Sequence, residues 1–431
     1  MTSHPPELDV ARPAPGSKTF SAARLVLGLM LLAAPFPYGA VYTWAWASIT
    51  VLTLLIVLLW LLGSIQQGWM KINYSPLYVP AALLLAIGVA QLVLHHTVAA
   101  VSTREAVLKL GTYLLLFYVV IQLFAEAPVT TWRRAGVGVL GFGFAFSFLS
   151  ILQFLWSPGR ILWVERNLTN AFGTYVDHDH YAGLMEMIVP LAAAYVLSRP
   201  KRDPLKGILW FAVAVPIVSL LLTGSRGGLG AILAEMAVLG SILIRRSPHS
   251  DRRVQVVTTG LALAGAAALF LWLVPAYTLA RMGSVNAYTT EAKEGRPALW
   301  KDSLGIFAEY PILGSGLGTF VTAFPAHQSK PQSLITEHAH NDYVEALTDG
   351  GLLGEFAVLA AVFIFLQTAF RHLEARLRHE TGWLELGASI ACCGLLVHSF
   401  VDFNLQIPAN TAWFAFCAGL AALSARTVAH R

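Results

Sequence analysis

One arginine of the sequence has neighbours that suit an anion-binding site. Arg226 stands in LLTGSRGGLGA, a short segment between two apolar stretches, where Gly224, Gly227 and Gly228 keep bulk away from the backbone. A planar guanidinium there can bind a phosphate through two parallel hydrogen bonds. The alternative is an arginine that simply extends to the lipid–water interface. We favour the anion site, because an anchoring arginine would tolerate bulkier neighbours.

Three further basic residues are candidates for the same anion. Arg296 lies in EGRPALWKDSL and is expected to begin a helix, because Pro297 suits a first helical turn. Arg104 and Lys109, in STREAVLKLG, would lie on neighbouring faces of a helix. Membrane anchoring explains these two nearly as well as substrate binding does. We assign all of them to substrate binding, with anchoring as the alternative.

Two pairs of histidines could supply a general base. His338 and His340 stand in TEHAHNDYVEALTDGGLLGE, and His178 and His180 stand in DHDHYAG. A neutral imidazole has a pKa of about 6.5 and can take up a proton at neutral pH. We expect His338 or His340 to act as the base and His180 to contact the substrate. The alternative is that these histidines merely lie at the membrane interface.

Closely spaced histidines can also bind a metal ion. Zinc sites usually need three or four His, Cys or carboxylate ligands at characteristic spacings. His178, Asp179, His338 and His340 could form such a set only if two segments far apart in the sequence met. We therefore predict no metal and no other cofactor.

The elements that hold these residues must be membrane helices. Of the 431 residues, 56% are hydrophobic and 12% are charged, about half the charged fraction of a soluble domain. Long runs, among them 25–70, 72–103 and 254–280, contain no Asp, Glu, Lys or Arg. A helix needs about 20 apolar residues to cross the hydrocarbon core, and the runs do not alternate as barrel strands do. The sequence predicts an all-α polytopic membrane protein.

Twelve transmembrane helices are expected. They lie near 23–42, 45–64, 76–95, 107–126, 132–156, 181–199, 207–225, 227–245, 254–275, 347–371, 384–401 and 409–426. The predicted organisation is an N-terminal tail over 1–22, helices over 23–275, a long loop over 276–346 with the candidate base, helices over 347–426 and a C-terminal end over 427–431. A long connection of this kind is usually functional.

The basic residues indicate which side is which. With the N-terminus in the cytoplasm, 19 of the 29 Lys and Arg residues fall in inner segments, and five of the other ten lie in the long loop. Because cytoplasmic loops are rich in Lys and Arg, we predict that both chain ends are cytoplasmic. This distribution explains the net charge of +5 without nucleic acid as a partner. The candidate site would then lie on the opposite face.

Local signals predict that a helix begins directly after His338 and His340. Asn341 and Asp342 are suited to cap a helix. Gly350 and Gly351 would then break that helix or let another backbone approach. We expect this start to fix the two histidines at the end of the long loop.

Several other polar or reactive residues fall inside predicted spans. Glu186 and Glu235 are ionisable groups at membrane depth, where a structural hydrogen bond is as good an explanation as catalysis. Cys392, Cys393 and Cys417 have no zinc-like spacing and are expected to pack as small apolar residues. We assign none of them to the active site.

The segment HNDYVEALTDGGLLG, from His340 to Gly354, resembles the signature of the O-antigen ligase and polymerase superfamily. That signature is His-Asn, nine residues, Gly, two residues and Gly, and its first glycine is here Gly351. The turn around Arg226 is similar to an arginine turn of the family, and Arg296 resembles its second arginine. Twelve spans with a long outer loop before the tenth also fit, so the resemblance covers nearly the whole chain.

The resemblance implies a GT-C-like, metal-independent glycosyltransferase of the bacterial inner membrane, with its active site on the periplasmic face. It would transfer O-antigen polysaccharide from undecaprenyl diphosphate to a hydroxyl of lipid A–core and invert the anomeric carbon. Arginines would hold the diphosphate, and a histidine would deprotonate the acceptor. The signature favours His340 as the base, beside His338, and includes Asn341 in the site. A groove between helices would take the prenyl chain, so membrane lipid is a further partner.

Other activities remain open at this point. Within the superfamily, a polymerase would extend the repeat on its lipid carrier, and an O-linked oligosaccharyltransferase would modify a protein. A secondary transporter often has twelve helices too, but its site lies near the bilayer midplane. Because the candidate residues lie at the outer ends of the spans, we favour an enzyme over a transporter. Within the superfamily we rank the ligase first.

Overall fold

The computed structural model describes residues 17–157, 160–164, 170–246, 295–329 and 335–423. The predicted ninth span, 254–275, lies outside the described residues. Within these ranges the chain forms helices and no strand, and the one isolated β-bridge joins Phe172 to Tyr175.

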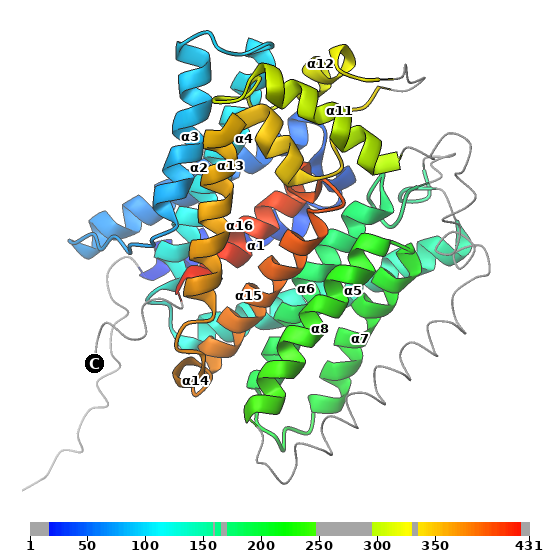
Figure 1. The fold of residues 1–431 in the computed structure, drawn as a ribbon. Helices are drawn as coiled ribbons and strands as arrows, with labels where there is room; N and C mark the ends of the chain where they lie inside the picture. The colour runs from blue at the N-terminus through cyan, green and yellow to red at the C-terminus, as the bar shows by residue number, and fades with distance from the viewer. Residues whose placement is uncertain (1–16, 158–159, 165–169, 247–294, 330–334, 424–431) are drawn as a thin grey trace, which may run out of the picture.

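Apolar stretches of the sequence become the helices of the bundle (Figure 1). In chain order they are α1 (Ser17–Ala33), η1 (Tyr38–Ala40), α2 (Thr43–Gln67), α3 (Tyr78–Val93), α4 (Ala100–Phe124), α5 (Val129–Trp156), α6 (His178–Ser198), α7 (Lys206–Thr223), α8 (Arg226–Arg246), α11 (Gly295–Glu309), α12 (Phe320–Ala323), η2 (Phe324–Ala326), α13 (Asp342–Ala369), α14 (Leu373–Arg376), α15 (Glu380–His398), η3 (Asn404–Gln406) and α16 (Pro408–Ala422).

Eight of the described helices are long and apolar enough to cross a membrane, namely α2, α4, α5, α6, α7, α8, α13 and α15. The helices α1, α3 and α16 coincide with three further predicted spans and are shorter, at 17, 16 and 15 residues. The all-α polytopic class is thereby supported. The count of twelve and the likeness to GT-C bundles stay predictions.

Two helices differ from their predicted bounds for local reasons. The first was expected over 23–42 but begins at Ser17 and ends at Ala33, because Pro35 and Pro37 follow and cannot continue a helix. The fourth was expected from 107 but begins at Ala100. Its extra turns are polar, which a hydropathy pattern does not detect.

The predicted loop over 276–346 contains helical segments in its described part. Pro297 lies in the first turn of α11, as predicted, and α12 with η2 follows. In Figure 1, α11 and α12 lie across one end of the bundle, above the first turns of α13. They cover the end of the bundle on which the candidate residues were predicted.

Helix α6 forms the centre of the bundle. It packs along α15 and also contacts α5, α7 and α8. Small residues make this possible, because a Cβ at Gly387 of α15 would lie only 2.6 Å from that of Ala194. The three cysteines are free, and Cys392 and Cys417 are buried, which fits the predicted packing role.

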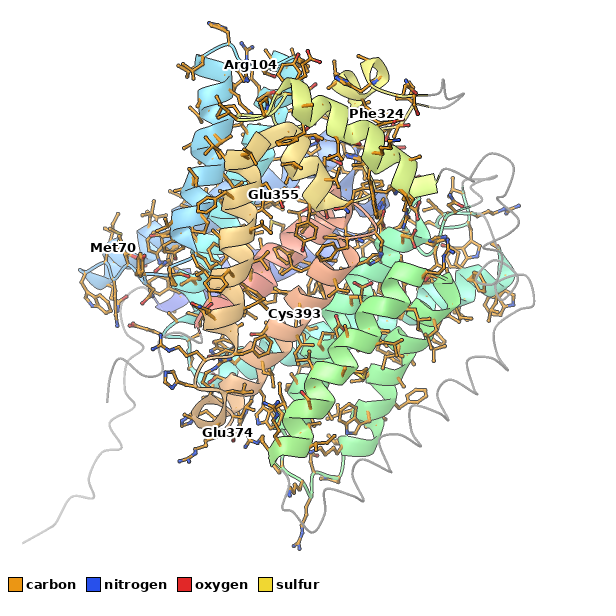
Figure 2. All side chains as sticks on the ribbon, in the orientation of Figure 1. Met70, Arg104, Phe324, Glu355, Glu374 and Cys393 are labelled. Atoms are coloured by element: carbon orange, nitrogen blue, oxygen red, sulfur yellow. The ribbon has the colours of Figure 1, made fainter. Side chains whose placement is uncertain are left out.

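The two ends of the bundle correspond to the two predicted sides. Figure 2 shows Arg104 and Phe324 at one end and Glu374 at the other. The predicted cytoplasmic end carries exposed ion pairs, such as Arg133 with Glu380 at 2.6 Å. The separation agrees with the predicted topology, and which end is cytoplasmic remains a prediction.

Candidate functional site

The centre of the candidate site is the short connection between α15 and α16. Asp402 lies there, and only 2% of its side chain is exposed. Its Oδ1 is 3.2 Å from Nδ1 of His340, and its Oδ2 is 3.8 Å from Nε2 of His180 and 3.9 Å from Nε2 of His398. One buried carboxylate therefore faces three imidazoles from three separate segments.

The histidines around Asp402 keep that carboxylate ionised. Burial by itself would raise the pKa of Asp402, but the hydrogen bond from His340 and the charge of His180 outweigh it. The pKa of Asp402 is therefore held below its usual value. An ionised Asp402 can accept the Nδ1 proton of His340, which leaves the lone pair on Nε2 free to take a proton.

Phe403, the next residue, holds the same histidines by ring packing. The ring of His338 stacks on it at 4.3 Å between centroids, and the rings of His180 and His340 meet it edge-on at 4.6 and 4.8 Å. The DHDH and HAHN segments, far apart in the sequence, thus meet around one aromatic side chain.

His340 has a backbone conformation that a side chain rarely adopts. Its φ is +48°, which for a residue other than glycine costs about 1–3 kcal/mol. The next residue fixes it in place: the Asn341 side chain accepts hydrogen bonds from the N–H groups of Tyr343 and Val344 and caps α13. The predicted cap is confirmed. The strained backbone of His340 indicates that the surrounding structure holds this residue in place.

A second pair involves His338. Its Nδ1 is 2.8 Å from Oε1 of Glu345, whose other oxygen accepts from the N–H of Ala339. Burial lowers the pKa of His338, but the charge and hydrogen bond of Glu345 raise it more, so the net pKa lies above the usual value. Trp300 of α11 donates to the carbonyl of Ala339 at 2.9 Å, which ties the long loop to this segment.

The arginine turn lies against the same cluster. Gly224 has a φ of +71° and ends α7, and the Ser225 hydroxyl accepts the N–H of Gly228 at the start of α8. A Cβ at Gly227 would overlap the ring of His398. The glycines that were read as making room for a phosphate therefore also let the turn pack on buried histidine.

Arg226 itself is exposed. Among the ion pairs and hydrogen bonds of the described residues, none neutralises its guanidinium. It begins α8, whose free N–H groups add partial positive charge at the same place. An unpaired arginine at a helix N-terminus is suited to bind a phosphate.

Arg296 is brought to the N-terminus of α6. Its Nη2 lies 3.9 Å from Oδ2 of Asp179, two residues after the start of the DHDH segment. The first turn of α6 also contacts the arginine turn, since a Cβ at Gly228 would lie 2.7 Å from that of Ala182. Arg296 and the arginine turn thus both lie beside the N-terminal part of α6, which carries His180.

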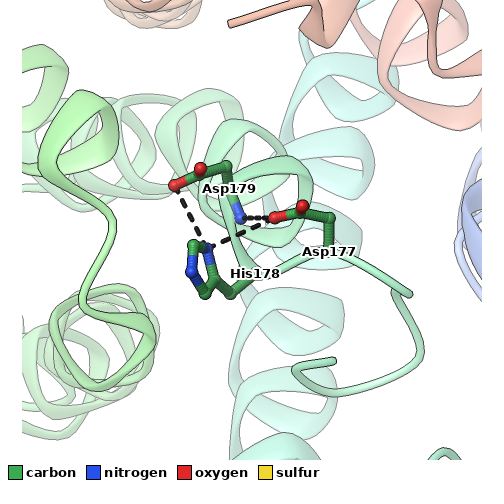
Figure 3. A group of neighbouring side chains, drawn as sticks. All are labelled: Asp177, His178 and Asp179. Atoms are coloured by element: carbon green, nitrogen blue, oxygen red, sulfur yellow. Dashed lines mark hydrogen bonds and ion pairs between the residues drawn. The ribbon is translucent and has the colours of Figure 1, made fainter. Parts of the chain in front are cut away.

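Two carboxylates and one imidazole at the start of α6 could surround a cation. Nδ1 of His178 lies 3.1 Å from Asp179 and 3.3 Å from Asp177 (Figure 3). The Asp177 carboxylate, however, already accepts the N–H of Asp179 and caps α6. Arg296 supplies positive charge beside Asp179, so we interpret this group as the anchor of Arg296. The set predicted as a possible zinc site, with His338 and His340, is not a cluster among the described residues.

The two basic residues of α4 occupy a different place. Lys109 pairs with Glu105 at 2.7 Å and lies 5.1 Å above the ring of Trp46. Arg104, at the end of the bundle in Figure 2, lines a shallow pocket with Thr50 and Leu92. In the described part of the chain, no contact joins either residue to the arginine turn. Their predicted convergence with Arg226 is not observed.

A large cavity opens beside His338. It has a volume of about 720 Å³ and lies between α3, α4, α13 and α16. Most of its wall is apolar, and its polar end includes Lys109, His338 and Glu345. Its shape and composition suit a hydrocarbon chain that carries a polar head near the two histidines.

The glycines of the predicted signature have a structural cause. Gly351 has a φ of +63° and ψ of −161°, and a Cβ there would overlap the carbonyl oxygen of Ile312. Gly351 thus kinks α13. The segment after Ile312 is bound beside this kink, since the N–H of Gly318 donates to the Asp349 carboxylate at 2.7 Å. Gly351 therefore lets the middle of the long loop pack against α13, as predicted for this glycine.

Sequence reasoning missed Asp402, Phe403 and His398. The available signal was weak: Asp402 is a lone charge in an otherwise uncharged stretch, close after a histidine. Glu345 was also missed, although it lies five residues after His340 and about one helical turn after the cap.

The comparisons with known proteins give a family match over part of the chain. Residues 211–359 match the family model described as O-antigen ligase. The matched segment contains Arg226, Arg296, His338 and His340, whereas Asp402 lies beyond it. No match was found among curated proteins.

Proposed function

We propose that the chain, whose residues 211–359 match the family model described as O-antigen ligase, belongs to the O-antigen ligase/polymerase superfamily and is an O-antigen ligase. It transfers O-antigen polysaccharide from undecaprenyl diphosphate to a hydroxyl of lipid A–core. One observation carries this proposal. Arg226 is exposed and has no ion pair among the described residues, and its turn packs against the same cluster, formed by α6 and the connection after α15, that holds the His340–Asp402 pair. Cation and base are the two groups that this transfer needs.

In the proposed reaction, Nε2 of His340 takes the proton from the acceptor hydroxyl as its oxygen attacks the anomeric carbon. The bond from that carbon to the diphosphate oxygen breaks, and undecaprenyl diphosphate leaves. Arg226 and Arg296 stabilise the negative charge that develops on the leaving group. Attack opposite the leaving group inverts the anomeric carbon. Asp402 accepts a hydrogen bond from the Nδ1–H group of His340 and stabilises the imidazolium that forms when Nε2 takes up the proton.

We assign the base to His340 rather than His338. Asp402, the partner of His340, also faces His398, whose ring packs on the arginine turn. His338 faces the apolar cavity instead. His180 and Asn341 then complete the site, the first beside Asp402 and the second as the cap that holds His340.

The membrane setting follows from the same proposal. The two chain ends would be cytoplasmic and the site periplasmic at the inner membrane, as the distribution of Lys and Arg favours. The cavity of about 720 Å³ would house part of the prenyl chain, with its polar end toward the histidines. Charge stabilisation by arginines makes the proposed reaction metal-independent.

Lipopolysaccharide from cells that carry Arg226→Ala or His340→Ala tests the proposal. A ligase variant leaves bare lipid A–core while the lipid-linked polymer accumulates. Core capped with a single repeat would instead assign the chain as a polymerase. Unchanged ladders together with an under-glycosylated protein would favour the O-linked oligosaccharyltransferase, and unchanged ladders alone would overturn the enzyme assignment. Arg104→Ala, outside the cluster, is the matched control.

A further inference from the structure

We infer that His398 is a positioning residue that holds the arginine turn and His340 in one fixed arrangement, through Glu186 on one side and Asp402 on the other. The inference rests on the proposed function, because it assigns His398 a role in that reaction. His398 is the last residue of α15 and lies outside the segment matched to the family model. No direct contact joins it, among the described residues, to the Arg226 guanidinium or the His340 imidazole, the two groups assigned to act on the substrates.

The first contact of His398 is a buried ion pair. Its Nδ1 lies 2.8 Å from Oε1 of Glu186 on α6, and both side chains are almost completely buried. An unpaired charge at such a place would be costly. The pair therefore locks the end of α15 to the middle of the central helix.

The second contact of His398 is with the arginine turn. Its ring occupies the space that a Cβ of Gly227 would need, and a Cβ at Gly228 would lie 3.1 Å from Oε1 of Glu186. The backbone that carries Arg226 thus rests directly on both members of the ion pair. A shift of this pair would move the first turn of α8 and, with it, Arg226.

The third contact of His398 reaches His340. Nε2 of His398 is 3.9 Å from Oδ2 of Asp402, and the other oxygen of Asp402 is 3.2 Å from Nδ1 of His340. An imidazole can present an N–H to both carboxylates only when both of its nitrogens carry protons. His398 would then be a fixed cation that orients Asp402, and Asp402 would orient His340.

The charged groups that face this cluster come from several elements. They are Asp177, Asp179, His180 and Glu186 of the α6 segment, Arg296 of α11 and Asp402 with His340 on the loops at the end of the bundle. Glu235 of α8 lies close to α15 as well, because a Cβ at Gly394 would overlap its carboxylate. His398 is surrounded by these groups and lies between the arginine turn and the His340–Asp402 pair.

Two conservative variants separate the two sides of His398. In His398→Asn, the amide can replace Nδ1 and keep the bond to Glu186, but it cannot reach Asp402. In His398→Gln, the amide extends toward Asp402 in place of Nε2. Purified full-length variants would be assayed in nanodiscs with undecaprenyl-diphosphate-linked saccharide and lipid A–core, and kcat and KM would be measured against pH.

We expect His398→Asn to lower kcat about 100-fold, the size of effect that small misplacement of a reacting group produces. The acid limb of kcat/KM should also move, because the variant removes a charge beside the reacting groups. His398→Gln should restore part of kcat. In a double variant with Asp402→Asn, the two losses should not add.

The control is Glu385→Gln, which breaks another buried ion pair of α15, with Arg376, at the opposite end of the bundle. It should lower thermal stability without moving the acid limb. Unchanged kcat and pH profile in His398→Asn, with His340→Ala inactive, would overturn this inference alone. Full activity of His340→Ala would overturn the proposed function instead. Equal shifts in His398→Asn and Glu385→Gln would show a purely structural role and also overturn the inference.

Discussion

Two histidine–carboxylate pairs lie side by side in this protein, and they differ in what surrounds them. In both, Nδ1 faces a carboxylate, Asp402 for His340 and Glu345 for His338. The side chain of His340 is 38% exposed and that of His338 is 27% exposed, so accessibility does not separate them.

The neighbours of the carboxylates do separate the two pairs. Asp402 belongs to a cluster that reaches the arginine turn, whereas Glu345 belongs to α13 and lines the apolar cavity. Two imidazoles that are two residues apart in the sequence can therefore have different roles, because their carboxylate partners belong to different elements and so have different neighbours. We assign proton transfer to His340 and the rim of the lipid-binding cavity to His338.

The largest effect should come from removing the two histidines one at a time. His340→Ala should lower the ligation rate by about 10²–10⁴-fold, the usual loss for a general base. His338→Ala should cost about tenfold or less, because the arginines and the base remain in place. Rates measured with purified substrates would check this order, and a greater loss in His338→Ala would reverse our assignment.

The next effect concerns the carboxylates themselves. Asp402→Asn should lower kcat about 100-fold, since an amide can present its N–H to Nδ1 of His340 and favour the wrong tautomer. Glu345→Gln should change kcat much less. Equal kcat values for the two variants would contradict the distinction between the pairs. The amount of folded protein, measured by size-exclusion chromatography, serves as the control.

A smaller effect should be visible in stability. The folded-state pKa of His338 is raised, so its pairing with Glu345 stabilises the fold fully below the unfolded pKa of about 6.5. This contribution is lost as the pH rises through the raised pKa. The difference in Tm between the native chain and Glu345→Gln should therefore shrink from pH 6 to pH 9, and a difference that grows with pH would contradict it.

The smallest effect is expected on the cavity side. Lys109→Met removes the ion pair with Glu105 but leaves the arginine turn untouched. We expect kcat to stay within about twofold, with any change in the KM for the lipid-linked donor, because uniform binding affects KM alone. A loss of kcat as large as that of Arg226→Ala would place Lys109 in the reaction after all.

Much of the fold could be predicted from the sequence, because apolar runs and their ends carry the signal for membrane helices. The start of α4 could not, since Glu105 and Lys109 support each other one turn apart and extend the helix beyond its apolar part. The cap at Asn341 and the position of Pro297 in a first helical turn were predicted correctly, because both depend on local residue types.

The site was predicted only as far as single segments reveal it. Arg226, Arg296, His180 and His340 were identified from their own neighbours, and the structure brings them together. The partners Asp402 and His398 could not be found, because nothing in the spacing pairs residue 340 with residue 402. For the same reason, Arg104 and Lys109 were grouped with arginines that they do not contact.

We propose that His340, supported by Asp402, acts as the base and that Arg226 stabilises the diphosphate while a lipid-linked saccharide is transferred to lipid A–core. The most direct test is to incubate the purified chain with undecaprenyl-diphosphate-linked saccharide and lipid A–core and to quantify the ligated product. We predict product from the native chain and from Arg104→Ala, and none from His340→Ala. Product from His340→Ala at the native rate, or none from the native chain, would contradict the assignment.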